Sequence, residues 1–503
     1  MPSDVADDAL ADALGLRDSN SPLLDRIHPL NAASLRGQGA YVLCWLQQAL
    51  RGEQNPLIDV ALRLANARGV PVLVYHGMSQ SYPHASDRLH WMLLGGSRDV
   101  ARACAARGIR MLSHVVRPGH IEKGLVYRLA EKAVAVICED HPTFVASWQS
   151  RSLADGTDCA VWAVDAARLV PYRILPNGLR TTPAFRKASG ERRERYLPGI
   201  DPVTPAHAPY DGPLPFTPDD LEGASDDRLR TLMTECEIDH SLPVCEAHPP
   251  ERAVALARMR DFVDRHLARY KWTRNNPAAP GSGSELSPYL HFGMIAPWEV
   301  AQAVHAAEVH SAARWKFLDE MLTWREYFHY QALHMPAFET FDGLPDRPRE
   351  SLLGHAGDPR DTRYNLDELL HGRTGDETWN AAQRQWMRDG YMHNNLRMYW
   401  GKKIIQWTPD PETAWNVACY INDRISLDGR DPATYGNMRW CFGAAKPAYR
   451  EQPVYGWVAP KSDRALRKRT GAPEWLQEMA GADVPRIAVP NGWPDAPRTG
   501  ARG

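Results

Sequence analysis

WNAAQRQWMRDGYMHNNLRMYWGKKIIQW (residues 379–407) and INDRISLDGRDPATYGNMRW (residues 421–440) belong to the tryptophan-rich stretch around which this 503-residue chain is organised. Its tryptophans stand among arginine, asparagine and aspartate side chains. Trp400 and Trp407 are seven residues apart, which is two turns and roughly 10 Å along one face of a helix. The spacing suits a stacked helical core. It equally suits indoles that relay an electron between a buried redox cofactor and the surface.

The chain on either side of this stretch has a helical pattern from about residue 251 onward. Segments such as ERAVALARMRDFVDRHLARYKW (251–272) are amphipathic, and no series of strand-like runs follows them. The pattern predicts an all-α domain over residues 251–476. A Pro- and Gly-rich tail is expected over residues 477–503.

The N-terminal part alternates short apolar runs with amphipathic stretches. The runs are GAYVLCW (39–45), VPVLVYH (70–76), IRMLSHVV (109–116), AVAVICED (133–140) and CAVWAVD (159–165). They predict an α/β domain over residues 26–166, with a doubly wound parallel sheet of about five strands, after a flexible acidic lead over residues 1–25. Such sheets bind ligands at the carboxyl ends of their strands. The phosphate-loop sequences GxGxxG and GxxxxGK[ST] are absent, so this is not a standard nucleotide domain.

Residues 167–250 differ in composition from both flanking parts. They are rich in Pro, Gly and charge and show little periodicity. This composition predicts an extended linker between the two domains.

The overall composition excludes several classes of protein. Lys and Arg number 59 against 61 Asp and Glu, a formal net charge of −2, so a nucleic-acid partner would need a local basic patch. The 8 cysteines include no CxxC pair, which argues against a zinc site or a disulfide framework and favours a cytoplasmic protein. The first 20 residues are acidic without a long apolar core, so we expect neither a signal peptide nor a membrane anchor.

GSGSELSPYLHFG (281–293) is a candidate phosphate-binding segment. Its glycines permit a tight loop, and Ser284 and Ser287 offer hydroxyl groups beside the free N–H groups of a helix start. The alternative interpretation is an ordinary serine cap of the helix.

Glu326 lies in the aromatic segment WREYF (324–328). A carboxyl group held among aromatic rings could have a raised pKa and could protonate or hydrogen-bond a substrate carbonyl. Alternatively, it pairs with Arg325 or another arginine.

Arg397, Asn422 and Asp428 are candidates for tuning a redox cofactor. An Arg397–Asp428 pair would supply a fixed dipole, and Asn422 could hydrogen-bond a ring nitrogen of a flavin. A buried polar network that ties helix ends together is an equally good interpretation. Asp431 precedes Pro432 and is expected to be a turn or cap residue.

RALRKR (464–469) is a short basic run after Trp440 and Trp457. Basic groups near exposed aromatic rings are typical of proteins that hold phosphates while a ring fills a gap in a base stack. A solvated helix face is the alternative.

Four segments together resemble the photolyase/cryptochrome superfamily, and within it the class II cyclobutane pyrimidine dimer photolyases. They are LSPYLHFG (286–293), WNAAQ (379–383), MHNNLRMYWGKKIIQWT (392–408) and YINDRISLDGRDP (420–432). The resemblance implies a light-dependent DNA repair lyase that splits cyclobutane pyrimidine dimers in UV-damaged DNA by electron transfer from photoexcited, reduced FAD. It also implies an antenna chromophore of the deazaflavin or folate type and, as we expect, a monomer.

The resemblance assigns roles to residues at matching positions. The FAD phosphates would be held by Ser284, Leu286 and Ser287, and the isoalloxazine would be surrounded by Arg397, Asn422 and Asp428. The photoreduction relay would run from Trp400 through Trp379 to Trp407. The substrate side would contain Glu326, Met398, Asn394 and the aromatic wedge Trp440. Trp386 and Trp415 remain as core residues.

Several positions depart from the class II pattern. Asn394 stands where class II proteins usually carry Gly, Glu285 puts a negative charge into the phosphate loop, and residues 437–457 follow the pattern loosely. These departures leave two alternatives open. One is a cryptochrome-like photoreceptor without repair activity, and the other is a flavoenzyme of the same fold with a different substrate.

Overall fold

The computed structural model describes residues 3–16, 20–444 and 449–489. Two compact units share the chain. The first comprises Met1–His240, Pro250–Ala257 and Tyr289–Ala306, and the second comprises Ser241–Pro249, Arg258–Pro288 and Ala307–Gly503. Each unit therefore contains segments that are distant in the sequence. The domain boundaries drawn from composition remain a prediction.

A six-stranded sheet forms the centre of the first unit in the described residues. Its strands are β1 (Ile27–Pro29), β2 (Tyr41–Leu46), β3 (Val72–Met78), β4 (Arg110–Val115), β5 (Ala133–Glu139) and β6 (Ala160–Val164), in the order β1-β6-β5-β2-β3-β4. The pairs β6–β5, β5–β2, β2–β3 and β3–β4 are parallel, whereas β1 pairs antiparallel with β6. The predicted doubly wound sheet is confirmed, because all five apolar runs form strands. The short edge strand β1 was not predicted.

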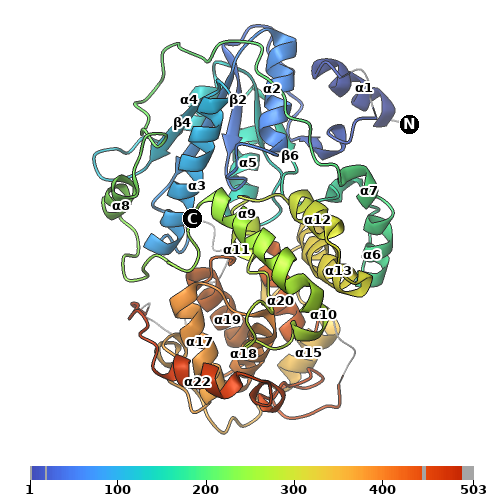
Figure 1. The fold of residues 1–503 in the computed structure, drawn as a ribbon, viewed down its shortest axis with the longest axis vertical. Coiled ribbons are helices and arrows are strands. Elements are labelled where there is room, and N and C mark those ends of the chain that lie inside the picture. Colours follow the sequence, from blue (N-terminus) through green and yellow to red (C-terminus); the bar gives the residue numbers. More distant parts are fainter. Residues whose placement is uncertain (1–2, 17–19, 445–448, 490–503) are drawn as a thin grey trace. The chain divides into compact units, whose positions relative to one another are not determined.

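Helices pack around this sheet (Figure 1). They are α2 (Pro56–Arg68), α3 (Asp87–Ala106), α4 (Leu125–Ala130) and α5 (Phe144–Asp155). Asn55 caps the start of α2 by accepting the N–H of Leu57. Gly69 ends α2 in the left-handed conformation at φ 70°, which glycine adopts without a Cβ penalty.

The Glu139 carboxylate lies at the point of the sheet where the strand order reverses. The chain leaves β5 and β2 in opposite directions across the sheet, and a ligand usually binds at such a switch point. Here Glu139 Oε1 accepts the backbone N–H groups of Gln47, Gln48 and Ala49 at 2.8, 2.7 and 2.8 Å. Because the carboxylate fills the cradle formed by these N–H groups, a phosphate group has no donors left there.

Residues 167–250, predicted to be an extended linker, contain three helices. These are α6 (Thr182–Gly190), α7 (Arg193–Tyr196) and α8 (Asp226–Thr234). Each spans nine residues or fewer, so its apolar face has too few positions to produce a visible period. The acidic lead likewise forms α1 (Ser3–Ala13), and its Ala11 and Leu14 are buried.

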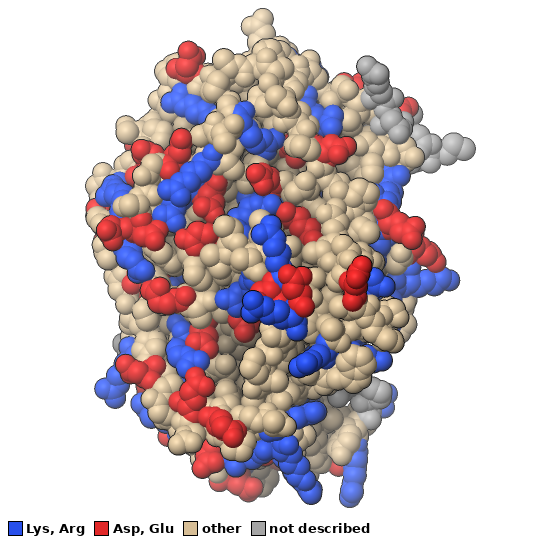
Figure 2. Space-filling view, in the orientation of Figure 1, with Lys and Arg blue, Asp and Glu red and all other residues tan. Residues whose placement is uncertain are grey.

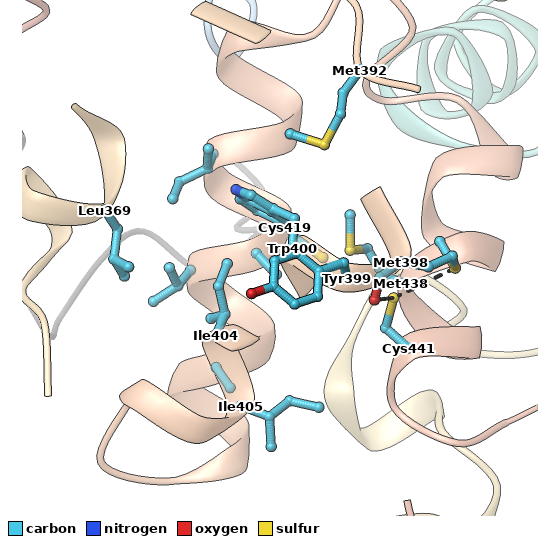
Figure 3. Packing of buried hydrophobic residues seen from close by; sticks show 14 of the residues in the cluster. Leu369, Met392, Met398, Tyr399, Trp400, Ile404, Ile405, Cys419, Met438 and Cys441 are labelled. Carbon is cyan, nitrogen blue, oxygen red and sulfur yellow. Dashed lines mark hydrogen bonds between the residues drawn. The ribbon is translucent and has the colours of Figure 1, made fainter. Parts of the chain in front are cut away.

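The second unit is helical, as predicted; apart from the isolated bridge Gln452–Gly456, its described residues form no β-structure. Its larger helices are α10 (Leu267–Thr273), α13 (Ser311–Leu318), α14 (Glu326–His334), α15 (Asp346–Gly354), α17 (Glu377–Asp389), α18 (Asn394–Trp407), α19 (Pro411–Ile425), α20 (Pro432–Cys441) and α22 (Ala472–Ala480). Helix α18 contacts α17, α19 and α20, and the four tryptophans Trp379, Trp386, Trp400 and Trp415 are fully buried in this core. Figure 3 shows Trp400 among Leu369, Ile404, Ile405 and Cys419 of the same cluster.

The remaining helices are short or join the two units in sequence. They are α9 (Arg252–Asp261), α11 (Ser287–His291), α12 (Pro297–Ala306), α16 (Leu366–Leu370) and α21 (Arg464–Arg467). In the part of the chain that the structure describes, no helix combines the length and the apolar character that crossing a membrane requires.

Candidate functional site

Helix caps fix the elements that carry the candidate site. Asp376 accepts the N–H of Trp379 at the start of α17, and Asp410 accepts the N–H of Thr413 at the start of α19. Asp431 accepts the N–H of Ala433 at the start of α20, which confirms its predicted role as a cap. These caps set where α17, α19 and α20 begin and so where their site residues lie.

Three of the tryptophans form a continuous chain. Trp400 and Trp379 are stacked, with ring centroids 5.9 Å apart and planes 9° from parallel. Trp379 in turn meets Trp407 edge to face, with centroids 5.4 Å apart. Trp400 and Trp379 are fully buried, and Trp407 is 6% exposed. The structure therefore brings together the three indoles that the resemblance selected, in the predicted order from the interior outward.

Hydrogen bonds fix the orientation of each inner indole. The Trp379 Nε1–H donates to the carbonyl oxygen of Trp400 at 3.1 Å, and the Trp400 Nε1–H donates to Gln383 Oε1 at 2.8 Å. Gln383 Nε2 donates to the carbonyl of Leu370 at 2.9 Å, so its oxygen faces the indole. A buried N–H without a partner would cost free energy, and both N–H groups here are satisfied.

Trp386 connects the tryptophan chain to a polar cluster. Its ring lies 5.1 Å from that of Trp400, edge to face, and the Arg397 guanidinium carbon is 5.0 Å from its centroid. Its Nε1–H donates to Ser426 Oγ at 3.0 Å, and Ser426 donates to Asp428 Oδ1 at 2.6 Å. Trp386 is a core residue, as expected, and it also contacts the candidate cofactor site.

Arg397 and Asp428 form a buried ion pair. Arg397 Nη2 donates to Asp428 Oδ1 at 2.9 Å. Burial alone would raise the pKa of Asp428, but the Arg397 charge and hydrogen bonds from Ser287 and Ser426 outweigh it and hold the pKa below its usual range. The carboxylate is therefore ionised at neutral pH and provides the fixed dipole that the sequence analysis anticipated.

Asn422 holds a buried amide with one unused oxygen. The side chain is fully buried on α19, and its Nδ2 donates to Asp423 Oδ1 at 3.0 Å. Because the Asp423 carboxylate can only accept a hydrogen bond, the amide nitrogen of Asn422 must face it, and the amide oxygen Oδ1 points away from Asp423. Among the described residues, Oδ1 has no hydrogen-bond partner. Since buried polar atoms are rarely left unpaired, this oxygen is available to accept a hydrogen bond from a bound ligand.

The loop between α19 and α20 is held in a strained conformation. A Cβ at Gly429 would lie 2.7 Å from the carbonyl oxygen of Asn422 and 3.0 Å from the Cα of Asp423, so only glycine allows this approach. Arg430 has a positive φ of 65°, which is unfavourable for a residue with a side chain. Its N–H donates to Asp423 Oδ1 at 3.0 Å, and this bond helps to hold the loop.

The predicted phosphate loop contains a second strained residue. Glu285 has a φ of 52°, and its carboxylate lies 2.5 Å from Arg258 Nη1 and 3.5 Å from His248 Nε2. Burial acts to raise the pKa of Glu285, but His248 and Arg258 lower it below its usual value. The carboxylate whose charge departs from the class II pattern is thus paired with Arg258 and lies beside His248.

The two serines and the leucine of this loop differ in their surroundings. Leu286 is buried, Ser284 is half-buried, and Ser287 hydrogen-bonds to Asp428. Helix α11 begins at Ser287 but has only five residues. Its dipole is therefore short, and a phosphate here would depend on loop N–H groups and side chains more than on the helix.

The residues assigned to the substrate side lie on three helices. Glu326 begins α14 directly after a π-helical turn over Asp319–Arg325, and it is 1% exposed. Met398 Sδ lies 3.8 Å from Cys441 Sγ (Figure 3). Trp440 is half-buried on α20, with Lys402 Nζ 5.7 Å from its ring centroid, and Asn394 is exposed at the start of α18.

Gln383 and Ser426 were not predicted as site residues, and Trp386 was expected only as a core residue. Gln383 and Trp386 stand four and seven residues after Trp379, so helical spacing places all three on one face of α17. That spacing could have identified both residues. Ser426 has no such signal, because its contact with Trp386 joins residues 40 positions apart.

The residues of this site fit a flavin nucleotide. The unpartnered Asn422 Oδ1 is an acceptor for a ring N–H, and the ionised Asp428 and its partner Arg397 can face a polar ring edge. Arg397 Nε is also buried without a partner among the described residues, so the cluster offers both a donor and an acceptor.

Comparison with known proteins agrees with this fold. No family model matches the chain. A deoxyribodipyrimidine photo-lyase of Methanothermobacter thermautotrophicus is 28% identical over 460 residues, which is 91% of this chain and 98% of the relative. A deoxyribodipyrimidine photo-lyase of Oryza sativa subsp. japonica is 31% identical over 435 residues, 84% of this chain and 83% of the relative.

A solved structure has the same fold. The class III photolyase of Agrobacterium tumefaciens matches with a TM-score of 0.63 at 19% identity, over 89% of this chain and 87% of that one. The parallel α/β unit and the helical unit described above are thus the fold of that photolyase. With a relative 31% identical over most of both chains, the chain belongs to the deoxyribodipyrimidine photolyase family.

Proposed function

We propose that this protein is a light-dependent DNA repair lyase that splits cyclobutane pyrimidine dimers. The observation that supports it most is the unbroken path Trp407–Trp379–Trp400–Trp386, which ends at the Arg397–Asp428 pair. A purely structural core would not require stacked indoles to connect a buried, ionised pair with the surface layer. A light-driven electron-transfer protein would require such a chain of indoles between its buried cofactor and the surface.

The FAD would be held by residues of the second unit. Bound FAD supplies the light absorption and the transferable electron that the reaction needs. Asn422 Oδ1 would accept a hydrogen bond from a ring N–H, and the ion pair with Asp428 would hold the Arg397 guanidinium at the ring edge. The phosphates would meet Ser284, Leu286 and Ser287, where Arg258 balances the charge of Glu285.

Trp400, Trp379 and Trp407 would conduct electrons inward from the surface. Trp407 is the outermost of the three, and the Lys403 ammonium lies 5.4 Å from its ring centroid. Trp379 Nε1 donates to the backbone of Trp400, which holds the two rings parallel. The relay serves to return a bound cofactor to its reduced form and is separate from the splitting step itself.

Glu326 is the residue that we assign to the reacting pyrimidines. Its carboxyl group is buried on α14, where a low dielectric strengthens any hydrogen bond that it makes to a substrate carbonyl. Met398 and Trp440 would contact the bases, with the half-buried indole of Trp440 as the wedge, and Asn394 would meet the DNA from the exposed start of α18. A dimer already stacks poorly, so extruding it costs less than extruding an intact pair.

The DNA partner must be recognised locally and not by a global charge. Figure 2 shows acidic and basic side chains interspersed over one face of the molecule. The short helix α21 carries exposed Arg464 and is followed by exposed Lys468 and Arg469, whereas Arg467 is paired with Glu377 and Asp463. We propose that the unpaired basic groups of this run contact DNA phosphates.

Three finer expectations accompany this proposal. An antenna chromophore of the deazaflavin or folate type would bind the α/β unit. It would bind without placing a phosphate at residues 47–49, because the Glu139 carboxylate already accepts the backbone N–H groups there. The protein would act as a monomer, and its compartment would be the cytoplasm. An absorption spectrum of the purified protein tests the first, since an additional near-ultraviolet band identifies an antenna.

The proposed function is tested by a repair assay. Purified protein, chemically reduced, is mixed with dimer-containing DNA and illuminated with blue light, and the remaining dimers are counted. We expect loss of dimers that requires both light and reduced protein. Bound FAD that photoreduces normally while the dimers persist would instead identify a photoreceptor of the same fold.

A further inference from the structure

Two histidines and one aspartate converge at the edge strand of the α/β unit. His114 lies on β4, and the following turn Arg117–Pro118–Gly119–His120 brings His120 back toward it. The His120 N–H donates to the carbonyl oxygen of Arg117 at 2.9 Å, and Gly119 has a φ of 76°. Pro at the second and a left-handed Gly at the third position are typical of a type II turn. The local sequence therefore determines where the second imidazole lies.

Asp219 is held against the same strand from a distant part of the chain. Its backbone N–H donates to the carbonyl oxygen of Ser113 at 2.8 Å, and its Oδ2 accepts the N–H of Val115 at 2.7 Å. These two bonds lie on either side of His114 along β4. The carboxylate is thus positioned by the backbone and lies beside the imidazoles without depending on them.

The imidazole nitrogens of His114 have no partner of their own. His114 is 1% exposed, and neither Nδ1 nor Nε2 has a hydrogen-bond partner among the residues that the structure describes. The ring contacts those of His120, at a centroid distance of 4.5 Å, and Phe216, at 5.4 Å.

One donor atom from each of the three side chains lies within 4.8 Å of the other two. A zinc ion with bonds of about 2.0–2.1 Å would need ligand atoms about 3.3 Å apart in a tetrahedral arrangement. Side-chain rotation of the partly exposed His120 can supply that contraction. His120 Nε2 already lies 3.4 Å from Asp219 Oδ2.

The surrounding charges leave room for a cation. The nearest positive group, Arg117, pairs with Asp219 Oδ1 at 2.9 Å and with Glu235 at 2.9 Å. Asp219 Oδ2 accepts the Val115 N–H and keeps a second lone pair for a ligand bond. The exposed carboxylate of Glu122, paired with Arg128 at 2.6 Å, also acts on both histidines and adds negative potential.

We propose that His114, His120 and Asp219 form a binding site for a divalent first-row transition metal ion, with zinc as the best fit. Two imidazole nitrogens and one carboxylate oxygen are a ligand set that zinc accepts, and water would complete the coordination. The absence of CxxC pairs had argued against a zinc site, but this one uses no cysteine. The ion would fasten the 117–120 turn and the segment around Asp219 to β4, where it covers the outer edge of the sheet.

The site is tested on the full-length protein after treatment with a chelator. Zinc chloride is titrated into the protein by calorimetry, and thermal unfolding is followed with and without zinc. The variants are His120→Ala, which removes a partly exposed ligand, and Asp219→Asn, which keeps an oxygen for the Val115 N–H. The matched control is His207→Ala, because His207 is an exposed histidine of the same unit that does not belong to the cluster.

We expect the wild-type protein and His207→Ala to bind one zinc ion per chain and to unfold at a higher temperature when zinc is present. His120→Ala and Asp219→Asn should bind on the order of tenfold more weakly or worse, and zinc should no longer raise their unfolding temperature. Equal zinc affinity in His120→Ala and wild type would overturn the proposal. So would a wild-type protein that binds no zinc at micromolar concentration. Flavin content should be the same in all four proteins, so the result is independent of the photochemistry.

Discussion

The indole of Trp379 stacks on that of Trp400, with an angle of 9° between the ring planes and ring centroids 5.9 Å apart, although the two residues belong to different helices. The Trp379 Nε1–H donates to the backbone of Trp400, and the Trp400 Nε1–H donates to Gln383, so neither ring can turn without breaking a buried hydrogen bond. This arrangement combines close aromatic contact with a fixed geometry.

Replacing Trp400 with Phe should slow photoreduction of the flavin by about tenfold or more, while repair by chemically reduced protein is retained. The loss of the indole N–H leaves Gln383 Oε1 unpaired and should cost about 2 kcal/mol of folding free energy. Trp415→Phe is the matched control, since Trp415 is equally buried and donates to the carbonyl of Glu339. It should lose similar stability but photoreduce normally. Equal photoreduction by both variants would show that Trp400 only packs.

Replacing Asp428 with Asn should lower both flavin retention and stability. Arg397 would keep its charge without a partner, which costs about 3–5 kcal/mol for a buried pair. The folded-state pKa of Asp428 is depressed, so its stabilisation is complete above about pH 4, the unfolded value, and is lost as the pH falls through the lower folded value. Urea unfolding between pH 7 and pH 3 measures this. The wild-type advantage over Asp428→Asn should shrink only below about pH 4, and an advantage that is independent of pH would contradict the pairing.

Replacing Gly429 with Ala should displace the loop that carries Asp428. The added Cβ meets the backbone of Asn422 and Asp423, which cannot move aside as a side chain can, and overpacking of this kind costs about 1–3 kcal/mol. Gly354→Ala is the control, because a Cβ at Gly354 meets no atom within 4 Å. Flavin absorbance per chain should fall in Gly429→Ala alone. Unchanged flavin content there would mean that the loop geometry does not matter for cofactor binding.

Replacing Glu326 with Gln should reduce dimer repair by about 100-fold, a typical loss for a missing acid–base group, while flavin photoreduction survives. The amide has nearly the volume of the carboxyl group, so packing on α14 is preserved. Glu320→Gln serves as the control from the preceding π-helical turn, where Glu320 pairs with Arg274 and Lys316. Repair at the wild-type rate in Glu326→Gln would remove this residue from the reaction.

Binding of damaged DNA should weaken as salt concentration rises, because bound phosphates release counterions. Substituting both Arg464 and Lys468 with Ala should reduce the slope of log affinity against log salt by about 2. Arg467→Ala should hardly change the slope, since Arg467 is already paired with Glu377 and Asp463. Filter-binding titrations at several salt concentrations provide the measurement. Identical slopes for the double variant and wild type would place the DNA contact elsewhere.

Local patterns in the sequence were sufficient for much of this protein. The five strands of the parallel sheet follow from continuous apolar runs, since a strand covered on both faces has no polar side to interrupt it. Asp431 was recognisable as a cap because capping depends only on the next few residues. The short helices α6, α7 and α8 were not predicted, because a helix of nine residues or fewer has too few turns for a repeating pattern of apolar residues to be visible.

The site depended on contacts between residues distant in the sequence. The motif resemblance named Trp400, Trp379 and Trp407, but the parallel stacking of the first two follows from how α17 packs on α18. No local pattern places Ser426 between Trp386 and Asp428, leaves Asn422 Oδ1 without a partner, or brings Asp219 to His114. Residue type and short-range spacing determine strands, caps and candidate groups. Side-chain packing between separate elements determines which groups meet, and at what distance and in what charge state they do so.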